Sequence, residues 1–216
     1  MIRLLTIFLL TVVTAKTEPV IRAGTGGFNG VIVREINYSN EVAGHSIEVF
    51  LQQGDYDFSG HKISGGKDYP VGRRPADYQP ATIDGIVIYG TEGKNPFDDA
   101  KEGKMVHDTL RKIELKWNDE KVDVSKALHV NLMGLELAPE WGAEKAMLFT
   151  PNPTGDALLI QLIGINAKTP YLVSLILRKN GEHQQIYHGS WKGDLPTREK
   201  AWKLVKAEQA GTGQPA

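Results

Sequence analysis

The clearest pattern of apolar and polar positions lies in the carboxy-terminal half of the chain. Residues 157–166 and 171–179 form two almost continuous apolar runs, a pattern typical of strands buried on both faces. Asn180-Gly181 separates the second run from residues 182–188, and this pair tolerates the positive φ angles of a type I′ hairpin turn. We therefore expect an antiparallel meander of three strands, with residues 167–170 as its first turn.

A strict alternation of apolar and charged residues lies upstream. Ile113, Leu115 and Trp117 alternate with charged residues at positions 112, 114 and 116, which predicts a strand with one buried face. Asn118-Asp119 then turns the chain toward residues 122–124, so a second hairpin is expected. Shorter candidate strands, each bounded by Gly, Pro, Asn or Asp, are residues 31–36, 47–51, 83–89 and 146–150.

Helical periodicity is confined to the end of the chain. Residues 197–209 place Ala201, Leu204 and Val205 on one face, with Pro196 before them and Gly211 after them, which predicts an amphipathic helix. Residues 125–133 fit a short helix or a strand. The whole pattern predicts a mainly β fold: an antiparallel sandwich or two packed sheets with one C-terminal amphipathic helix.

The amino terminus has the layout of a signal peptide. A short positive region that includes Arg3 precedes an apolar run at residues 4–13, and small-residue positions at Thr14 and Ala15 follow. Ten residues of helix span about 15 Å, half of a ~30 Å hydrocarbon core, so a membrane anchor is disfavoured. We expect residues 1–15 to be removed after Ala15, no membrane span in the mature chain, and an exported protein, periplasmic or secreted, from a bacterium.

A possible boundary interrupts the mature chain. Between Gly90 and Lys104 the sequence has three Gly, one Pro, seven charged residues and no apolar periodicity, as expected of a loop or linker. We place this linker at residues 91–104, between a β-rich region at 16–90 and a second β-rich region with the terminal helix at 105–216. One domain and two small domains both stay open.

Composition excludes several classes of function. With 25 Lys+Arg against 26 Asp+Glu, the formal net charge is -1, and nothing resembles the basic patch of a nucleic-acid-binding protein. The absence of cysteine excludes a thiol nucleophile, a thiolate metal site and a disulfide.

One segment partly matches a calcium-binding loop. Asp55, Asp57 and Ser59 occupy the first, third and fifth positions and Gly60 the sixth, but Gly66 stands where the loop needs a bidentate glutamate. A polar turn is therefore favoured, with a weak calcium site as the alternative. The six histidines show no zinc spacing, so we expect surface histidines, no resident metal and no cofactor.

Nucleophile motifs are equally incomplete. Ser64 and Lys67 have the spacing of a Ser-x-x-Lys dyad, but that dyad needs a helix and two glycines separate the residues. Residues 24–27 are glycine-rich without a phosphate-binding context, and we expect a flexible lead-in segment there. A hydrolase built on Asp and Glu residues that the fold brings together stays open, because sequence spacing does not reveal such pairs.

The loop at residues 68–80 combines the side chains that interfaces use most with three prolines. Its candidate binding residues are Tyr69, Arg73, Arg74 and Tyr78. Prolines lower the cost of ordering a loop on binding, although a loop ordered by its own packing is the alternative. We expect an exported, non-catalytic binding or accessory protein for an envelope, glycan or protein partner; the alternatives are an extracellular hydrolase and a structural envelope subunit.

Overall fold

The computed structural model describes residues 20–28, 31–56, 61–67, 75–88, 106–135, 137, 146–166 and 169–211. The expected signal peptide at 1–15 and the expected linker at 91–104 lie outside these residues. The strands are β1 (Val20–Phe28), β2 (Val31–Val42), β3 (His45–Tyr56), β4 (Ile63–Ser64), β5 (Thr82–Ile83), β6 (Ile86–Val87), β7 (Val106–Trp117), β8 (Glu120–Val122), β9 (Met147–Pro151), β10 (Ala157–Asn166), β11 (Thr169–Arg178) and β12 (His183–Ser190). The helices are the 3-10 turn η1 (Lys126–Leu128) and α2 (Arg198–Gly211).

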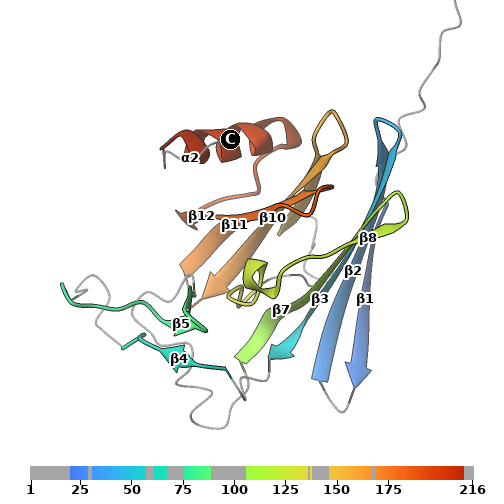
Figure 1. Ribbon diagram of the computed structural model, residues 1–216. Coiled ribbons are helices and arrows are strands. Elements are labelled where there is room, and N and C mark those ends of the chain that lie inside the picture. The colour runs from blue at the N-terminus through green and yellow to red at the C-terminus, as the bar shows by residue number, and fades with distance from the viewer. Residues whose placement is uncertain are drawn as a thin grey trace, which may run out of the picture.

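Two large antiparallel sheets pack against each other, as Figure 1 shows. The first has the order β1-β2-β3-β7-β8 and the second the order β12-β11-β10-β9, while β4, β5 and β6 form a small third sheet. The mainly β fold with a C-terminal helix is thereby confirmed. Alternation explains the packing, because every second residue of a strand points to the same face.

The main core fills the space between the two large sheets. Ile36, Leu51 and Leu115 come from the first sheet and Ile160 and Leu175 from the second, and all five are fully buried. Tyr38 of β2 stacks on Phe149 of β9, with ring centroids 4.3 Å apart. The Trp117 indole donates a hydrogen bond of 2.9 Å to the carbonyl oxygen of Gly155, so both sheets are joined by aromatic side chains.

Helix α2 covers the outer face of the second sheet (Figure 1). Its residues Ala201 and Val205 pack on Leu159 of β10 and Ile176 of β11 in a separate apolar cluster. Two backbone amides, at residues 200 and 201, donate to the carbonyl of Thr197 and start the helix there. The predicted helix is confirmed, and of its predicted apolar face Ala201 and Val205 are buried whereas Leu204 is partly exposed.

Local conformation differs from the sequence expectation at three places. Residues 83–88 are not one strand, because Asp84 (φ 51°) and Gly85 (φ 82°) turn the chain between β5 and β6. Residues 24–27 are not a flexible lead-in: they belong to β1 and pair with β2. At the Asn180-Gly181 turn only Gly181 has a positive φ, so the turn is not type I′.

Residues 126–135, which we name the bridging segment, run from β8 toward the second sheet without forming a strand. Only η1 is regular within it, so neither expected structure for residues 125–133 extends beyond one 3-10 turn. Three of its carbonyl groups accept hydrogen bonds from side chains of the sheets. Gln185 donates to Leu128 at 2.6 Å, Tyr171 to Met133 at 2.5 Å, and Gln53 to Leu135 at 2.5 Å. Side chains from both sheets therefore hold the bridging segment in place.

The core predicts a large difference between two isoleucines of β10. Ile160 is 0% exposed and Ile165 is 38% exposed. Ile160→Ala should lower the free energy of unfolding by about 2–5 kcal/mol, because it leaves a cavity between the sheets, whereas Ile165→Ala should change it by about 0.5 kcal/mol or less. Urea unfolding followed by circular dichroism measures both values, and equal losses would contradict this assignment of the core.

Candidate functional site

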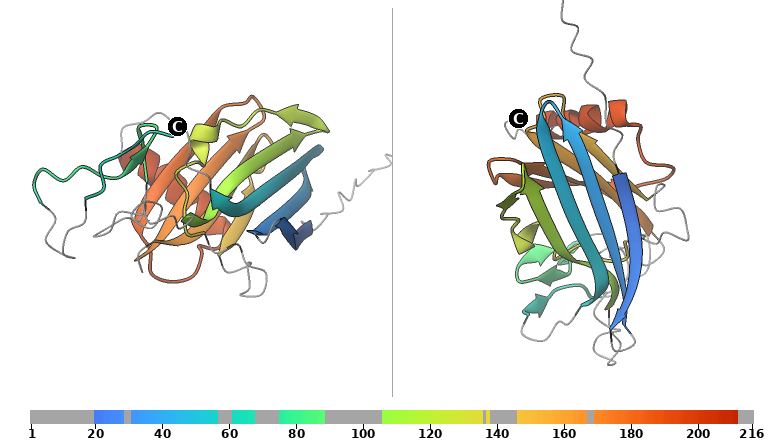
Figure 2. Two further views of the ribbon diagram at one scale, coloured as in Figure 1. Left: turned by 90° about the horizontal axis from the view of Figure 1, so that it is seen from below. Right: turned by 90° about the vertical axis from the view of Figure 1, so that its right-hand side faces the viewer.

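The small third sheet belongs to an arm that extends from one end of the sandwich. We define the arm as the described residues 61–67 and 75–88, which contain β4, β5 and β6. Figures 1 and 2 show it extending away from the two large sheets. The arm therefore presents its far end to the surroundings.

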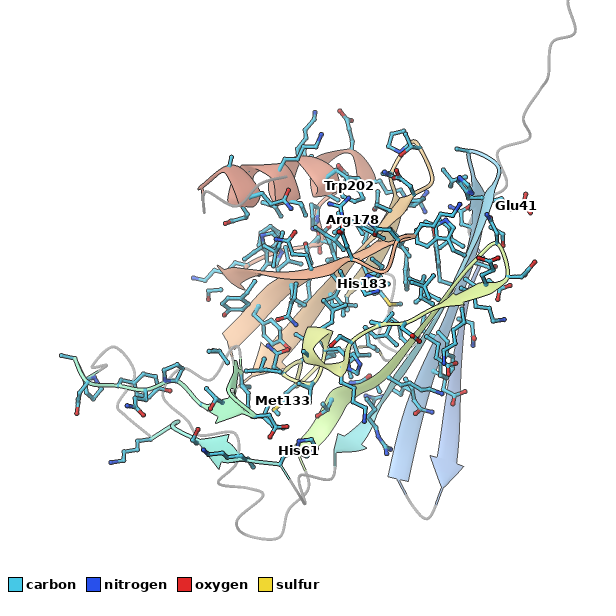
Figure 3. All side chains as sticks on the ribbon, in the orientation of Figure 1. Glu41, His61, Met133, Arg178, His183 and Trp202 are labelled. Carbon is cyan, nitrogen blue, oxygen red and sulfur yellow. The ribbon has the colours of Figure 1, made fainter. Side chains whose placement is uncertain are left out.

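The end of the arm nearest the sandwich, which we name its root (Ala81, Ile83 and Ile88), packs on the bridging segment. Ala81, Ile83 and Ile88 are buried against Val130 and Met133. The Asn131 side chain donates a hydrogen bond of 2.8 Å to the carbonyl oxygen of Val87. Figure 3 labels Met133 beside the arm, on the side of the sandwich, and His61 where the arm begins. Apolar burial and one buried amide thus fix the arm to the sandwich.

The two segments of the arm that follow β4 and precede β5 meet at Gly66 and Gln79, a contact that we name the neck. The amide of Gly66 donates a hydrogen bond of 3.0 Å to the carbonyl of Gln79. Gly65 has φ +72°, and a Cβ there would lie 2.2 Å from the carbonyl oxygen of Pro80, so the two chain segments approach as closely as glycine allows. This contact holds together both ends of the predicted binding loop.

Only part of that binding loop is described. Tyr78 lies on the arm, half-buried, and its amide donates to the carbonyl of Pro75 at 3.2 Å. Tyr69, Arg73 and Arg74 lie outside the described residues. The binding role of these four residues therefore stays a prediction.

A polar pair stabilises the exposed side of the arm. His61 Nδ1 donates to Asp84 Oδ2 at 2.6 Å, and the amide of Lys62 donates to Asp84 Oδ1 at 2.9 Å. These two hydrogen bonds, that from His61 first, hold the pKa of the Asp84 carboxyl below its ordinary value. Asp84 is thus an ionised acceptor that ties the β5–β6 turn to the two residues that precede β4.

Two histidines are buried, contrary to the expectation of surface histidines. His129 Nδ1 donates to the carbonyl of Leu110 at 2.8 Å, and burial lowers the pKa of its imidazole. His188 of β12 lies under α2 with a side chain that is 1% exposed. His183 points to the other face of β12, where its Nε2 donates to the carbonyl of Asp123 at 2.9 Å.

His188 belongs to a polar cluster that sequence reasoning missed. Its Nε2 lies 2.8 Å from Ser174 Oγ of β11, and its Nδ1 lies 3.8 Å from Glu208 Oε1 of α2. Gln161 of β10 donates to Ser174 Oγ at 3.2 Å. The available signal was the presence of Gln161 and Ser174 within two apolar runs, since a polar residue in a buried strand needs a partner.

Ser174, His188 and Glu208 have the order of a catalytic triad, but the burial of the serine argues against catalysis. Ser174 is 0% exposed, in the middle of a central strand and beneath a helix. A nucleophile must contact the substrate carbonyl at about 3–3.5 Å, and a fully buried hydroxyl offers no exposed surface for that contact. The cluster therefore joins α2 to the sheet.

The remaining sites proposed from sequence are only partly described. Asp55 lies in β3, whereas Asp57 and Ser59 lie outside the described residues. Within the described ranges, no group of three or more His, Asp or Glu residues is arranged to hold a metal ion. None of the helices described is long and apolar enough to cross a membrane.

Comparisons with protein-family models, with curated proteins and with solved structures found no match for this chain. Its function must therefore be inferred from its own residues.

The neck contact predicts a difference between two arm glycines. Gly65→Ala and Gly85→Ala both introduce a side chain at a positive φ, but only position 65 has an atom in the way, since nothing lies within 4 Å of the new Cβ at position 85. The additional clash should cost about 1–3 kcal/mol and raise hydrogen exchange of the Gly66 amide about tenfold or more relative to Gly85→Ala. Equal exchange rates in the two variants would show that the neck is not closed.

Proposed function

We propose that this chain is an exported, non-catalytic binding protein that contacts an envelope, glycan or protein partner through the arm. The observation that carries the proposal is the combination of a firmly anchored root with a loop whose ends are held together beyond it. Binding residues are commonly carried by loops that a rigid scaffold positions. The arm has this arrangement.

The predicted binding residues suit such a role. The loop closed by the Gly66–Gln79 hydrogen bond contains Tyr69, Arg73, Arg74 and Tyr78. Tyrosine and arginine supply large contact area and forked hydrogen bonding, the properties of interface hot spots. A closed neck and the loop prolines reduce the conformational entropy lost on binding. The support is strongest for a partner that meets the far end of the arm.

Three of the described carboxyls lack the electrostatics that the hydrolase alternative needs in a general acid. Hydrogen bonds lower the pKa of Asp84, of Glu114 beside Lys112, and of Asp156 beside Asn152 and Thr154. A general acid in a glycosidase needs the opposite shift, a raised pKa. These three carboxyls are therefore acceptors and not proton donors at neutral pH.

Export predicts a defined new amino terminus. If residues 1–15 direct translocation, the purified native protein should begin at Lys16 and be recovered outside the cytoplasm. Amino-terminal sequencing of material from fractionated source cells measures this. Recovery of the chain beginning at Met1 in the cytoplasm would contradict export while leaving the arm untested, so binding is tested separately.

Contact through the arm predicts position-dependent cross-linking. Asp77 is exposed on the arm and Glu199 is exposed on α2. A photoreactive residue at position 77 should form an adduct in source cells, and the same residue at position 199 should not. Arg73→Ala combined with Arg74→Ala should abolish the adduct at position 77 and leave the thermal unfolding temperature unchanged. Mass spectrometry of the adduct distinguishes protein from glycan.

Two results would reject this proposal. Equal adduct yields from positions 77 and 199 would show that the arm has no special role. Unfolding of the double arginine variant would show that these side chains stabilise the loop itself, which is the alternative considered for residues 68–80.

A further inference from the structure

The contact between α2 and the second sheet has an apolar half and a polar half. Beneath the first part of the helix, Ala201 and Val205 pack on the sheet, and the Trp202 indole donates to the carbonyl of Thr150 at 3.1 Å; Figure 3 labels Trp202 on this helix. The last turn instead carries Glu208 and Gln209, and Gln209 donates to Gln184 of β12 at 2.8 Å. Polar groups therefore hold the end of α2.

Hydrogen bonding ties His188 to the second sheet through one ring nitrogen. The Gln161 amide nitrogen donates to Ser174 Oγ at 3.2 Å, and Ser174 Oγ shares a hydrogen bond of 2.8 Å with His188 Nε2, in which the imidazole tautomer decides the donor. Among the described residues Nδ1 has no hydrogen-bond partner, since 3.8 Å to Glu208 Oε1 is too long for one.

The surroundings of His188 are nearly uncharged. Strands β10 and β11 face it with the neutral Gln161 and Ser174, and α2 faces it with Glu208, which is 43% exposed. The other charged residues of α2 are exposed: Arg198, Glu199, Lys200, Lys203 and Lys206. Burial is the largest influence and lowers the pKa of His188, while Glu208 opposes it in part. A proton on this imidazole is thus better accommodated in water than beneath the helix.

We propose that His188 is an acid-sensitive latch for α2: the helix is docked on the second sheet while the imidazole is neutral and is released when the imidazole takes up a proton. Release uncovers Leu159 and Ile176 of the sheet. The latch is independent of the binding role proposed for the arm.

The direction of the pH dependence follows from linkage. With α2 released and hydrated, His188 titrates near its ordinary pKa of 6.5, whereas in the docked state its pKa is lower. The released state therefore binds more protons once the pH falls below about 6.5. Docking is fully stable above that pH and weakens below it, by at most about tenfold per pH unit because one proton is involved.

A single introduced thiol can test the latch because the chain has no cysteine. Ala201→Cys places the thiol on the buried face of α2, and Ala157→Cys places a control thiol in buried β10. The protection factor at each pH is the rate of labelling with dithiodipyridine in the urea-unfolded variant divided by the rate in the folded variant. Protection at position 201 should be constant from pH 8 to 7 and fall about tenfold or more by pH 5, while position 157 stays protected.

Three further substitutions, each combined with Ala201→Cys, separate the latch from general acid sensitivity. His188→Gln keeps an acceptor for Ser174 and cannot titrate, so protection should not change with pH. Glu208→Gln removes the carboxylate that favours the proton, so the loss of protection by pH 5 should be larger. His129→Asn changes the other buried histidine and should leave the fall intact.

Three outcomes would overturn the latch: constant protection at position 201 between pH 8 and 5, an unchanged fall in His188→Gln, or an equal fall at position 157. If His188→Gln does not fold, NMR titration of the unsubstituted protein gives the answer. A His188 resonance that titrates at or above pH 6.5, or α2 amides whose corrected exchange is the same at pH 8 and 5, would reject the proposal.

Discussion

The structure depends on a small number of buried hydrogen bonds from side chains to main-chain carbonyls. The bridging segment crosses between two sheets without forming a strand, and strand amides satisfy only some of its carbonyls: those of Leu132 and Gly134 accept from Leu110 of β7 and Ile165 of β10. A buried carbonyl without a partner costs about 1–3 kcal/mol. Gln53, Tyr171 and Gln185 supply the missing donors, and each comes from a different strand. Polar residues in the core thereby specify where an irregular segment lies.

The same segment connects the sandwich to the arm. Val130 and Met133 pack against the apolar residues of the arm. Asn131 exchanges hydrogen bonds with Gln185 and also donates to the carbonyl of Val87. A change that displaces the bridging segment would therefore disturb the core and the arm together. The contact of α2 with the sheet is separate, because it rests on the opposite face of β10, β11 and β12.

Sequence patterns predicted the elements whose structure is locally determined. The alternation around Leu115 and the apolar runs of β10 and β11 are properties of single strands, and the structure confirms them. Strand β1 was missed because its glycine-rich residues are extended only through pairing with β2. Asp84-Gly85 is a turn signal in the sequence, but the apolar residues on both sides of it led to the prediction of one strand at residues 83–89.

The candidate sites were less predictable, for a different physical reason. The conformation of residues 126–135 is set by side chains of Gln53 and Gln185, which lie far away in the sequence. Likewise, Ser174, His188 and Glu208 come from two strands and a helix, with no common motif. The arm loop was recognisable by composition alone, because its tyrosines, arginines and prolines are adjacent in the chain.

Strand connectivity has a consequence for the order in which the chain folds. In the two large sheets, every ladder but one joins strands that follow each other in sequence; the exception is the pairing of β3 with β7. Neighbouring strands close short loops, whereas β3 and β7 must enclose the whole arm between them, and the entropic cost of closure grows with loop length. The hairpins before and after the arm in the sequence can therefore form early. The first sheet is completed only when β3 and β7, the two strands that flank the arm in the sequence, pair with each other.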